Sequence, residues 1–261
     1  PLENPTFLTN MVECWSILII PMAMVFAFGF YIKRKKLAYT IYGVMLVGYL
    51  VGICFAHHFE MAGNPRIDEM GIAQNIGSME GKEMRIGAAG TATWSQTTTV
   101  TSNGSVNGMH DSTMPLTGMF TMLNMMINCW FGGVGVGFMN YYTFLIIAVF
   151  ISGLMVGRTP EFLGKKVEAR EMKIASIVAL CHPFIILVGT AIAAYLYAHA
   201  PGFVESEGGW LNNPSFHGFS EMLYEYTSSA ANNGSGFEGL GDNTYFWNFT
   251  CGLVLIIGRY F

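Results

Sequence analysis

Long apolar segments alternate with short polar ones along this chain. Residues 11–31 are apolar except for Glu13, and residues 37–59 contain no Asp, Glu, Lys or Arg. A helix needs ~20 apolar residues, at a rise of ~1.5 Å each, to cross the hydrocarbon core of a bilayer. Both segments meet that length, and so do residues 174–199. The pattern predicts an all-α polytopic membrane protein.

One apolar run is too long for a single crossing. Residues 112–157 contain no charged side chain, and as one helix they would extend ~69 Å, about twice the hydrocarbon core. Near the middle of the run lie Gly132, Gly133, Gly135 and Gly137. Each glycine weakens a helix by ~1 kcal/mol relative to alanine. We therefore predict a broken span over residues 113–157, with two half-helices joined by a flexible glycine hinge.

Two polar stretches interrupt the apolar pattern with similar chemistry. Residues 97–112 read TTTVTSNGSVNGMHDS and residues 227–236 read TSSAANNGSG, so hydroxyls and amides lead to Asn-Gly-Ser in both. At membrane depth, irregular polar backbone is tolerated only where it is buried in protein or lines a water-filled path. The alternative is a pair of surface turns, because Asn and Gly are common turn formers.

An ion filter is the function that this chemistry suits. Rings of backbone carbonyls can replace the hydration shell of potassium, and glycine lets the chain adopt the conformations that such a loop requires. The candidate potassium-binding residues are Thr101, Ser102, Asn103, Gly104, Ala231, Asn232, Asn233 and Gly234.

Basic clusters predict the orientation of the spans. Residues 33–36 read KRKK, and residues 158–173 carry five Lys or Arg. Short basic loops stay in the cytoplasm, so both clusters are expected inside. The remaining segments are then external loops at 60–94 and 200–217, a pore loop at 95–112, a pore helix with filter at 218–236, and a final span at 243–261. Residues 91–100 could form a half-helix or an extended segment.

Composition excludes several other classes. The 261 residues are 52% hydrophobic and 11% charged, whereas soluble domains carry about 25% charge. The net charge of −4 gives no reason to expect nucleic acid as a partner. The five cysteines lie in apolar segments without a CxxC pair, as buried thiols do. The chain begins with Pro1 and ends within an apolar run, which indicates an internal piece of a longer protein.

Motifs spread over the whole chain resemble one family, the potassium-translocating A subunit of bacterial Kdp transport ATPases. They are ENPT at 3–6 with LTN at 8–10, SNGSVN at 102–107, MHDS at 109–112, FGGVG at 131–135, GLMVGRTPEFLGKK at 153–166, REMK at 170–173, HGFSE at 217–221, AANNGS at 230–235, FWN at 246–248 and GR at 258–259.

The resemblance implies membrane-pore-membrane repeats of the potassium-transporter superfamily, four around one pore. This chain would hold the end of the second repeat (1–36), the third (37–173) and most of the fourth (174–261). It implies a non-hydrolytic subunit of a high-affinity potassium importer in the bacterial inner membrane. ATP would be hydrolysed by a P-type partner subunit, with small accessory subunits, and no nucleotide motif or transition-metal motif is present here.

The resemblance also assigns roles to single residues. The glycine hinge would gate passage below the filter, and the charge of Arg259 would favour release of a bound cation. The alternative for Arg259 is snorkelling at a helix end. Members of the family commonly have Glu where this chain has Asn128, which would leave Arg158 without that partner. Where this chain reads Ala-Ala-Asn-Asn-Gly at 230–234, they often have a third Asn.

Two further functions are open. The first is a self-sufficient potassium channel or secondary transporter of the same superfamily. The second is a membrane enzyme using His57, His58 and Asp111, although these lack a paired nucleophile and base. Asp111 could instead attract potassium, or it or Ser112 could cap the helix that starts near Pro115.

Overall fold

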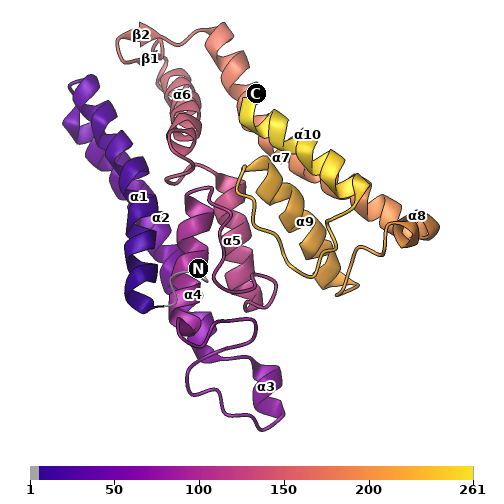
Figure 1. Ribbon diagram of the computed structural model, residues 1–261. Helices are drawn as coiled ribbons and strands as arrows, with labels where there is room; N and C mark the ends of the chain where they lie inside the picture. Colours follow the sequence, from indigo (N-terminus) through magenta and orange to yellow (C-terminus); the bar gives the residue numbers. More distant parts are fainter. Residues whose placement is uncertain (1–5, 261) are drawn as a thin grey trace.

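The computed structural model describes residues 6–260 as a helical assembly (Figure 1). Helices α1 (Phe7–Tyr31) and α2 (Lys35–Ala62) form an antiparallel pair joined by a tight turn. Thr6 caps α1, because its side chain accepts a hydrogen bond from the backbone N–H of Thr9. The buried apolar residues between the pair, Leu18, Val25, Ile41, Met45 and Tyr49, form a core with Val100 and Phe131.

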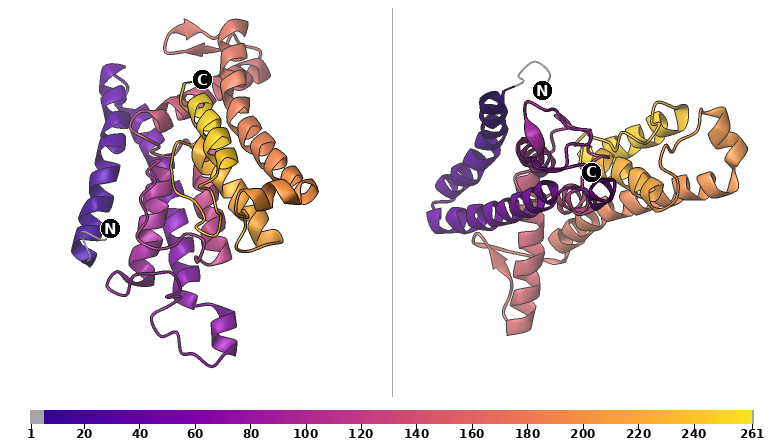
Figure 2. Two further views of the ribbon diagram at one scale, coloured as in Figure 1. Left: turned by 45° about the vertical axis from the view of Figure 1, so that its right-hand side comes forward. Right: turned by 90° about the horizontal axis from the view of Figure 1, so that it is seen from below.

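The centre of the assembly is built from two shorter helices. A loop with the short helix α3 (Pro65–Glu69) leads to α4 (Gly87–Val100), and α5 (Pro115–Ile127) follows the first polar stretch. Helix α4 packs against α1, α2 and α5 and is buried over most of its length. In the two further views, the α1–α2 pair and the helices of the C-terminal third lie on opposite sides of this centre (Figure 2).

The last part of the chain forms a second helical group. Helix α6 (Val136–Val156) leads through a small hairpin of β1 (Glu161–Phe162) and β2 (Lys165–Lys166) to the long helix α7 (Ala169–His199). Helices α8 (Pro201–Ser206), α9 (Phe216–Ala230) and α10 (Tyr245–Tyr260) complete the chain. Helices α7, α9 and α10 share a buried core that includes Ile186, Trp210, Tyr226, Trp247 and Val254.

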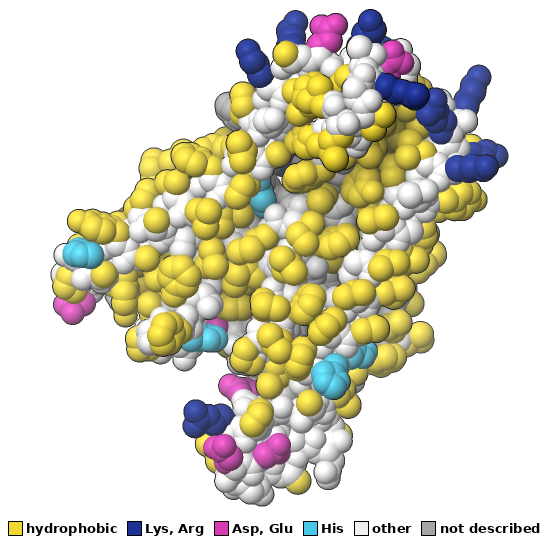
Figure 3. All heavy atoms as spheres, turned by 180° about the vertical axis from the view of Figure 1, so that it is seen from behind, with side chains coloured by type: hydrophobic (Ala, Val, Ile, Leu, Met, Phe, Trp, Pro, Cys, Tyr) yellow, Lys and Arg dark blue, Asp and Glu magenta, His cyan; other side chains and the backbone are white. Residues whose placement is uncertain are grey.

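The structure confirms the all-α membrane architecture. Within residues 6–260, four helices are long and apolar enough to cross a membrane: α1, α2, α6 and α7. Most of their side chains face outward, as lipid contact requires. Figure 3 shows a broad hydrophobic surface, with Lys and Arg gathered at one end over the α1–α2 turn and the hairpin. The exposed basic residues there are Lys33, Arg34, Lys35, Lys36, Arg158, Lys165, Lys166, Arg170 and Lys173.

The predicted interruption of the long apolar run is also confirmed, since α5 and α6 are separate helices around residues 128–135. One boundary differs from the prediction: the segment expected as an external loop at 60–94 contains the start of α4. Residues 91–100, for which a half-helix and an extended segment were both open, are helical. Within the final span expected at 243–261, the structure describes helix α10 over the 16 residues Tyr245–Tyr260. Residues 1–5 and 261, with part of the ENPT motif, lie outside the described residues.

Candidate functional site

The two polar stretches form equivalent loops at the ends of α4 and α9. After each helix the chain turns through one left-handed residue, Ser102 with φ 52° and Asn232 with φ 54°. The next backbone N–H then returns to the helix: Asn103 donates to the carbonyl of Thr98 and Asn233 to that of Ser228, both at 2.9 Å. This left-handed turn is a common way for a helix to end, and it occurs at the same position in both loops.

Asparagine side chains brace both loops in the same way. Asn103 Oδ1 accepts from the backbone N–H of Ser105 at 2.8 Å, and Asn233 Oδ1 accepts from that of Ser235 at 3.1 Å. An aromatic residue of the preceding helix then holds each serine. Trp94 Nε1 donates to the carbonyl of Ser105 at 3.0 Å, and the hydroxyls of Tyr224 and Ser235 share a 2.9 Å hydrogen bond.

The two loops touch each other at a glycine. A Cβ added to Gly104 would stand 2.6 Å from the carbonyl oxygen of Asn233 and 2.7 Å from the carbonyl carbon of Gly234. Only glycine permits this approach. Beside it, Asn233 Nδ2 donates to the carbonyl of Thr98 at 3.1 Å, so the second loop is also bonded to the end of α4.

All eight predicted filter residues therefore lie in two adjoining loops. Thr101, Ala231 and Asn233 are buried, and Gly234 is exposed. The Thr101 hydroxyl donates to the carbonyl of Thr97 at 2.7 Å, as neighbouring threonines of α4 donate to carbonyls one turn earlier. The hydroxyl protons of these threonines are therefore donated within the helix.

The break between α5 and α6 lies directly against the first loop. Helix α5 ends at Asn128, which has φ 44°, and the N–H of Gly132 donates to the carbonyl of Val100 at 2.6 Å. Gly132 and Gly137 pack backbone to backbone, with no room for a Cβ on either. The predicted hinge is corrected in one respect: Gly137 belongs to the first turn of α6, so the break covers residues 128–135.

Asn128 has contacts that the sequence did not indicate. Its side-chain oxygen accepts a 3.4 Å hydrogen bond from Ser102 Oγ, and its carbonyl accepts from Asn140 Nδ2 at 2.8 Å. The residue thus links the break to the first filter loop. Arg158 is exposed beside the hairpin and forms no ion pair within the described residues.

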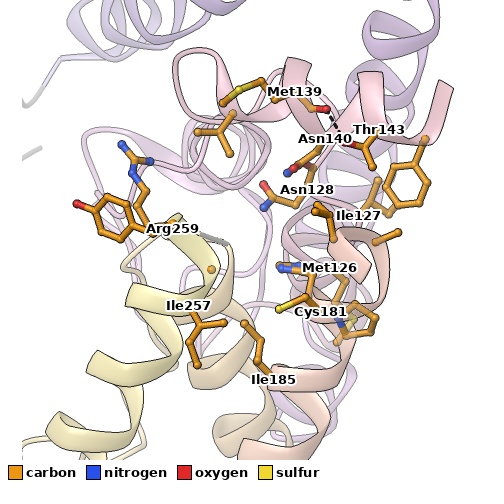
Figure 4. Close-up of a pocket in the computed structure, with 18 residues that line it drawn as sticks. Met126, Ile127, Asn128, Met139, Asn140, Thr143, Cys181, Ile185, Ile257 and Arg259 are labelled. Carbon is orange, nitrogen blue, oxygen red and sulfur yellow. Dashed lines mark hydrogen bonds between the residues drawn. The ribbon is translucent and has the colours of Figure 1, made fainter. Parts of the chain in front are cut away.

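A cavity of about 550 Å³ lies beside the break between α5 and α6 and is lined by residues of α5, α6, α7 and α10. Figure 4 shows Arg259 of α10 and Asn128 on facing sides of it. His182 also lines the cavity, and its Nε2 lies 3.1 Å from the carbonyl oxygen of Met125. Arg259 thus lines this cavity near the end of α10, and its side chain is exposed.

A polar network around Asp111, near the end of the first polar stretch, was not predicted from the sequence. Asp111 Oδ1 lies 2.6 Å from Nε2 of His217 on α9, and the carboxylate of Glu238 accepts the backbone N–H of Asp111 at 3.0 Å. Asp111 and Ser112 do not cap α5, since its N-cap is Met114, whereas Pro115 begins the helix as expected. The sequence feature that could have pointed to His217 was the HGFSE motif at 217–221.

The residues proposed for a membrane enzyme do not form a common site. His57 Nε2 is 2.7 Å from the hydroxyl of Thr93, His58 packs beside Phe59, and Asp111 pairs with His217. The three residues thus contact three different partners and are not brought together in the structure.

His110 provides a pH-dependent test of the loop structure. It is buried, its Nδ1 lies 2.8 Å from the hydroxyl of Tyr224, and burial lowers its pKa to about 4. The unfolded chain, with a histidine pKa of about 6.5, takes up the proton first as the pH falls. Stability should therefore be lost between pH 6.5 and pH 4, by up to roughly 3 kcal/mol.

We expect His110→Asn to flatten the pH dependence of thermal unfolding of the full-length protein over that window. The exposed His199, replaced in the same way, is the control and should leave the slope unchanged. Equal slopes for the wild type and His110→Asn would show that His110 is not held neutral by the fold.

Comparison with known proteins agrees with these features. The sequence profile described as the potassium-transporting ATPase A subunit matches residues 1–261. A protein of Phocaeicola vulgatus is 81% identical over 260 residues, and those of Bacteroides fragilis and Geobacillus kaustophilus are 77% and 46% identical over 260 residues. Each is named potassium-transporting ATPase potassium-binding subunit.

Each alignment covers 100% of this chain but only 46%, 46% and 45% of the three relatives, so the chain spans about half their length. Their names refer to an ATPase and do not favour a self-sufficient channel. The match over all described elements, including both polar loops and the broken helix, establishes the relationship: the chain belongs to the family of potassium-transporting ATPase A subunits.

Proposed function

We propose that this chain supplies two of the four walls of a potassium filter in an ATP-driven importer. The observation that carries the proposal is the contact of two equivalent loops at Gly104 and Gly234. Backbone carbonyls suit potassium, because they replace its hydration shell without a formal charge. The coordinating segments would be residues 101–104 and 231–234.

The broken helix would control passage below the filter. Residues 132–135 lie against the first loop through the Gly132 N–H to Val100 hydrogen bond, so a movement of the break would change the space beneath the filter. The cavity beyond it would receive the released ion. Arg259 would then lower the affinity of this cavity for a cation and favour onward release.

The rest of the machinery would come from other chains. A P-type partner subunit would hydrolyse ATP, and small accessory subunits would complete the complex. The assembly would lie in the bacterial inner membrane with the basic clusters at 33–36 and 158–173 facing the cytoplasm, in accordance with the positive-inside rule. The chain would then comprise the end of the second repeat, the third repeat and most of the fourth, with boundaries near residues 36 and 173.

Asn233→Ala tests the filter in the full-length subunit assembled with its partners. The substitution removes the hydrogen bond to the Thr98 carbonyl and both bonds to Ser235, at 2.7 and 3.1 Å. With about 1 kcal/mol lost for each of two or more bonds, the potassium concentration that half-activates the ATPase should rise at least about tenfold. Potassium-stimulated ATPase activity and potassium uptake are the measurements.

Asn212→Ala, in the loop before α9, is the matched control, since Asn212 is exposed and within residues 6–260 bonds through its backbone N–H, to the carbonyl of Gly239. It should leave the potassium dependence unchanged. Wild-type activity that does not respond to potassium, or an Asn233 variant with unaltered affinity, would contradict the proposed function.

A further inference from the structure

Three metal-ligating side chains meet at the outer end of the filter loops. Asp111 comes from the end of the first polar stretch, whereas His217 and Glu221 lie one turn apart on α9. One ligand atom from each lies within 4.8 Å of the other two. His217 Nε2 is 2.6 Å from Asp111 Oδ1 and 3.8 Å from Glu221 Oε1. The cluster thus joins segments that are about a hundred residues apart in the chain.

A buried carboxylate in this cluster lacks full compensation. Glu221 is 0% exposed, and its Oε2 has no hydrogen-bond partner. Glu238 adds a further carboxylate next to Asp111. Within residues 6–260, His217 is the one basic side chain that forms ion pairs with Asp111 and Glu221. Burying a carboxylate without a counter-charge costs several kcal/mol. The surplus of negative charge therefore favours a bound cation.

The ligand set identifies the class of cation. One imidazole with two carboxylates, and a fourth position open to water, is a coordination set that Zn²⁺ accepts. We propose that Asp111, His217 and Glu221 bind a zinc ion at the mouth of the filter loops. Zinc binding here would not require potassium in the loops.

The geometry requires only small adjustments. Ligand atoms at about 2.0–2.1 Å from a tetrahedral ion lie ~3.3 Å apart, between the two distances from His217. His217 is 46% exposed and can move outward by less than ~1 Å to open the short contact. Binding replaces its hydrogen bond to Asp111, and any proton on the ligating nitrogen goes to solvent.

Neighbouring groups orient both carboxylates. Asn213 Nδ2 donates to Asp111 Oδ2 at 3.2 Å and to Glu221 Oε1 at 3.0 Å. Gly239 lies so close that an added Cβ would meet Glu221 Oε1 at 2.2 Å and Asp111 Oδ2 at 2.7 Å. Such outer contacts fix the ligands of a metal site and commonly contribute 10–100-fold to its affinity.

Zinc binding by the purified full-length complex tests the proposal, with Zn²⁺ as the probe and a chromophoric chelator as competitor. His217→Ala should weaken one zinc site by more than about 100-fold, since a direct ligand matters more than its supporting partners. Glu221→Gln should weaken the same site. X-ray absorption at the zinc edge should show imidazole nitrogen and oxygen ligands at about 2.0–2.1 Å in the wild type.

His199→Ala is the matched control, because His199 is an exposed histidine at the end of α7. It should leave zinc binding unchanged. His217→Ala changes a half-exposed side chain and should fold, so the test does not depend on the buried Glu221. Equal zinc stoichiometry and affinity in wild type and His217→Ala would overturn the proposal and leave the cluster as a metal-free hydrogen-bond network.

Discussion

Gly104→Ala in the full-length subunit should lower the potassium affinity of the assembled transporter by at least ~100-fold. The new Cβ would stand 2.6 Å from the carbonyl oxygen of Asn233 and 2.7 Å from the carbonyl carbon of Gly234. Both are backbone atoms, so no change of rotamer can relieve the overlap, and the loops must separate. Misplacing positioned groups by ~1 Å commonly costs about 10²-fold, or about 2.7 kcal/mol.

The measurement is a potassium titration of ATPase activity, combined with potassium uptake by cells that express the same complex. Gly252→Ala on α10 and Gly43→Ala on α2 are matched controls, since a Cβ at either position meets no heavy atom within 4 Å. Both should retain wild-type affinity. If a Gly104→Ala complex assembles and keeps wild-type potassium affinity, the contact between the two loops is not part of the potassium site.

The spans and the broken helix could be predicted because their signals are local. Length and hydropathy identify a crossing segment, and a glycine cluster marks the break. The start of α4 could not be found in this way. Its first residues, Gly87 to Thr93, are all glycine, alanine or threonine; two are glycines and two are threonines, which have low helix propensity. The helix is stabilised by burial against α1, α2 and α5, and these contacts cannot be inferred from the periodicity of the sequence.

Two matching loops could also be predicted, because the same polar composition occurs twice in an apolar chain, whereas their role as a filter stays a prediction. The contact between Gly104 and the second loop could not, since it depends on how the helices dock. The same holds for the pairing of Asp111 with His217 at the mouth. Gly104 and Asp111 lie in a segment without periodicity, and their partners are more than 100 residues away in the chain. Asn128 appeared only as a departure from the family, although its contact with Ser102 links the break to the loop.

The buried ion pair of Glu60 and Lys82 should stabilise the segment that follows the first polar stretch, around residues 112–114. Lys82 Nζ lies 2.9 Å from Glu60 Oε2, and both side chains are 0% exposed. Glu60 Oε1 accepts from the backbone N–H of Met114 at 2.8 Å, and Lys82 donates to the carbonyl of Ser112 at 3.4 Å. The pair therefore joins α2 and the external loop to the segment between the first filter loop and α5.

Lys82→Met should destabilise the full-length protein by about 3–5 kcal/mol, because it leaves the Glu60 carboxylate buried without its counter-charge. The double variant Glu60→Gln with Lys82→Met should recover most of this loss, since the amide oxygen can still accept from Met114. Thermal unfolding of the purified complex measures both. Arg85→Met is the control for removing a cation from the same loop, as Arg85 pairs with Glu83 at the surface. It should have no measurable effect, and equal effects of Lys82→Met and Arg85→Met would mean that the Glu60–Lys82 pair is not buried in the working protein.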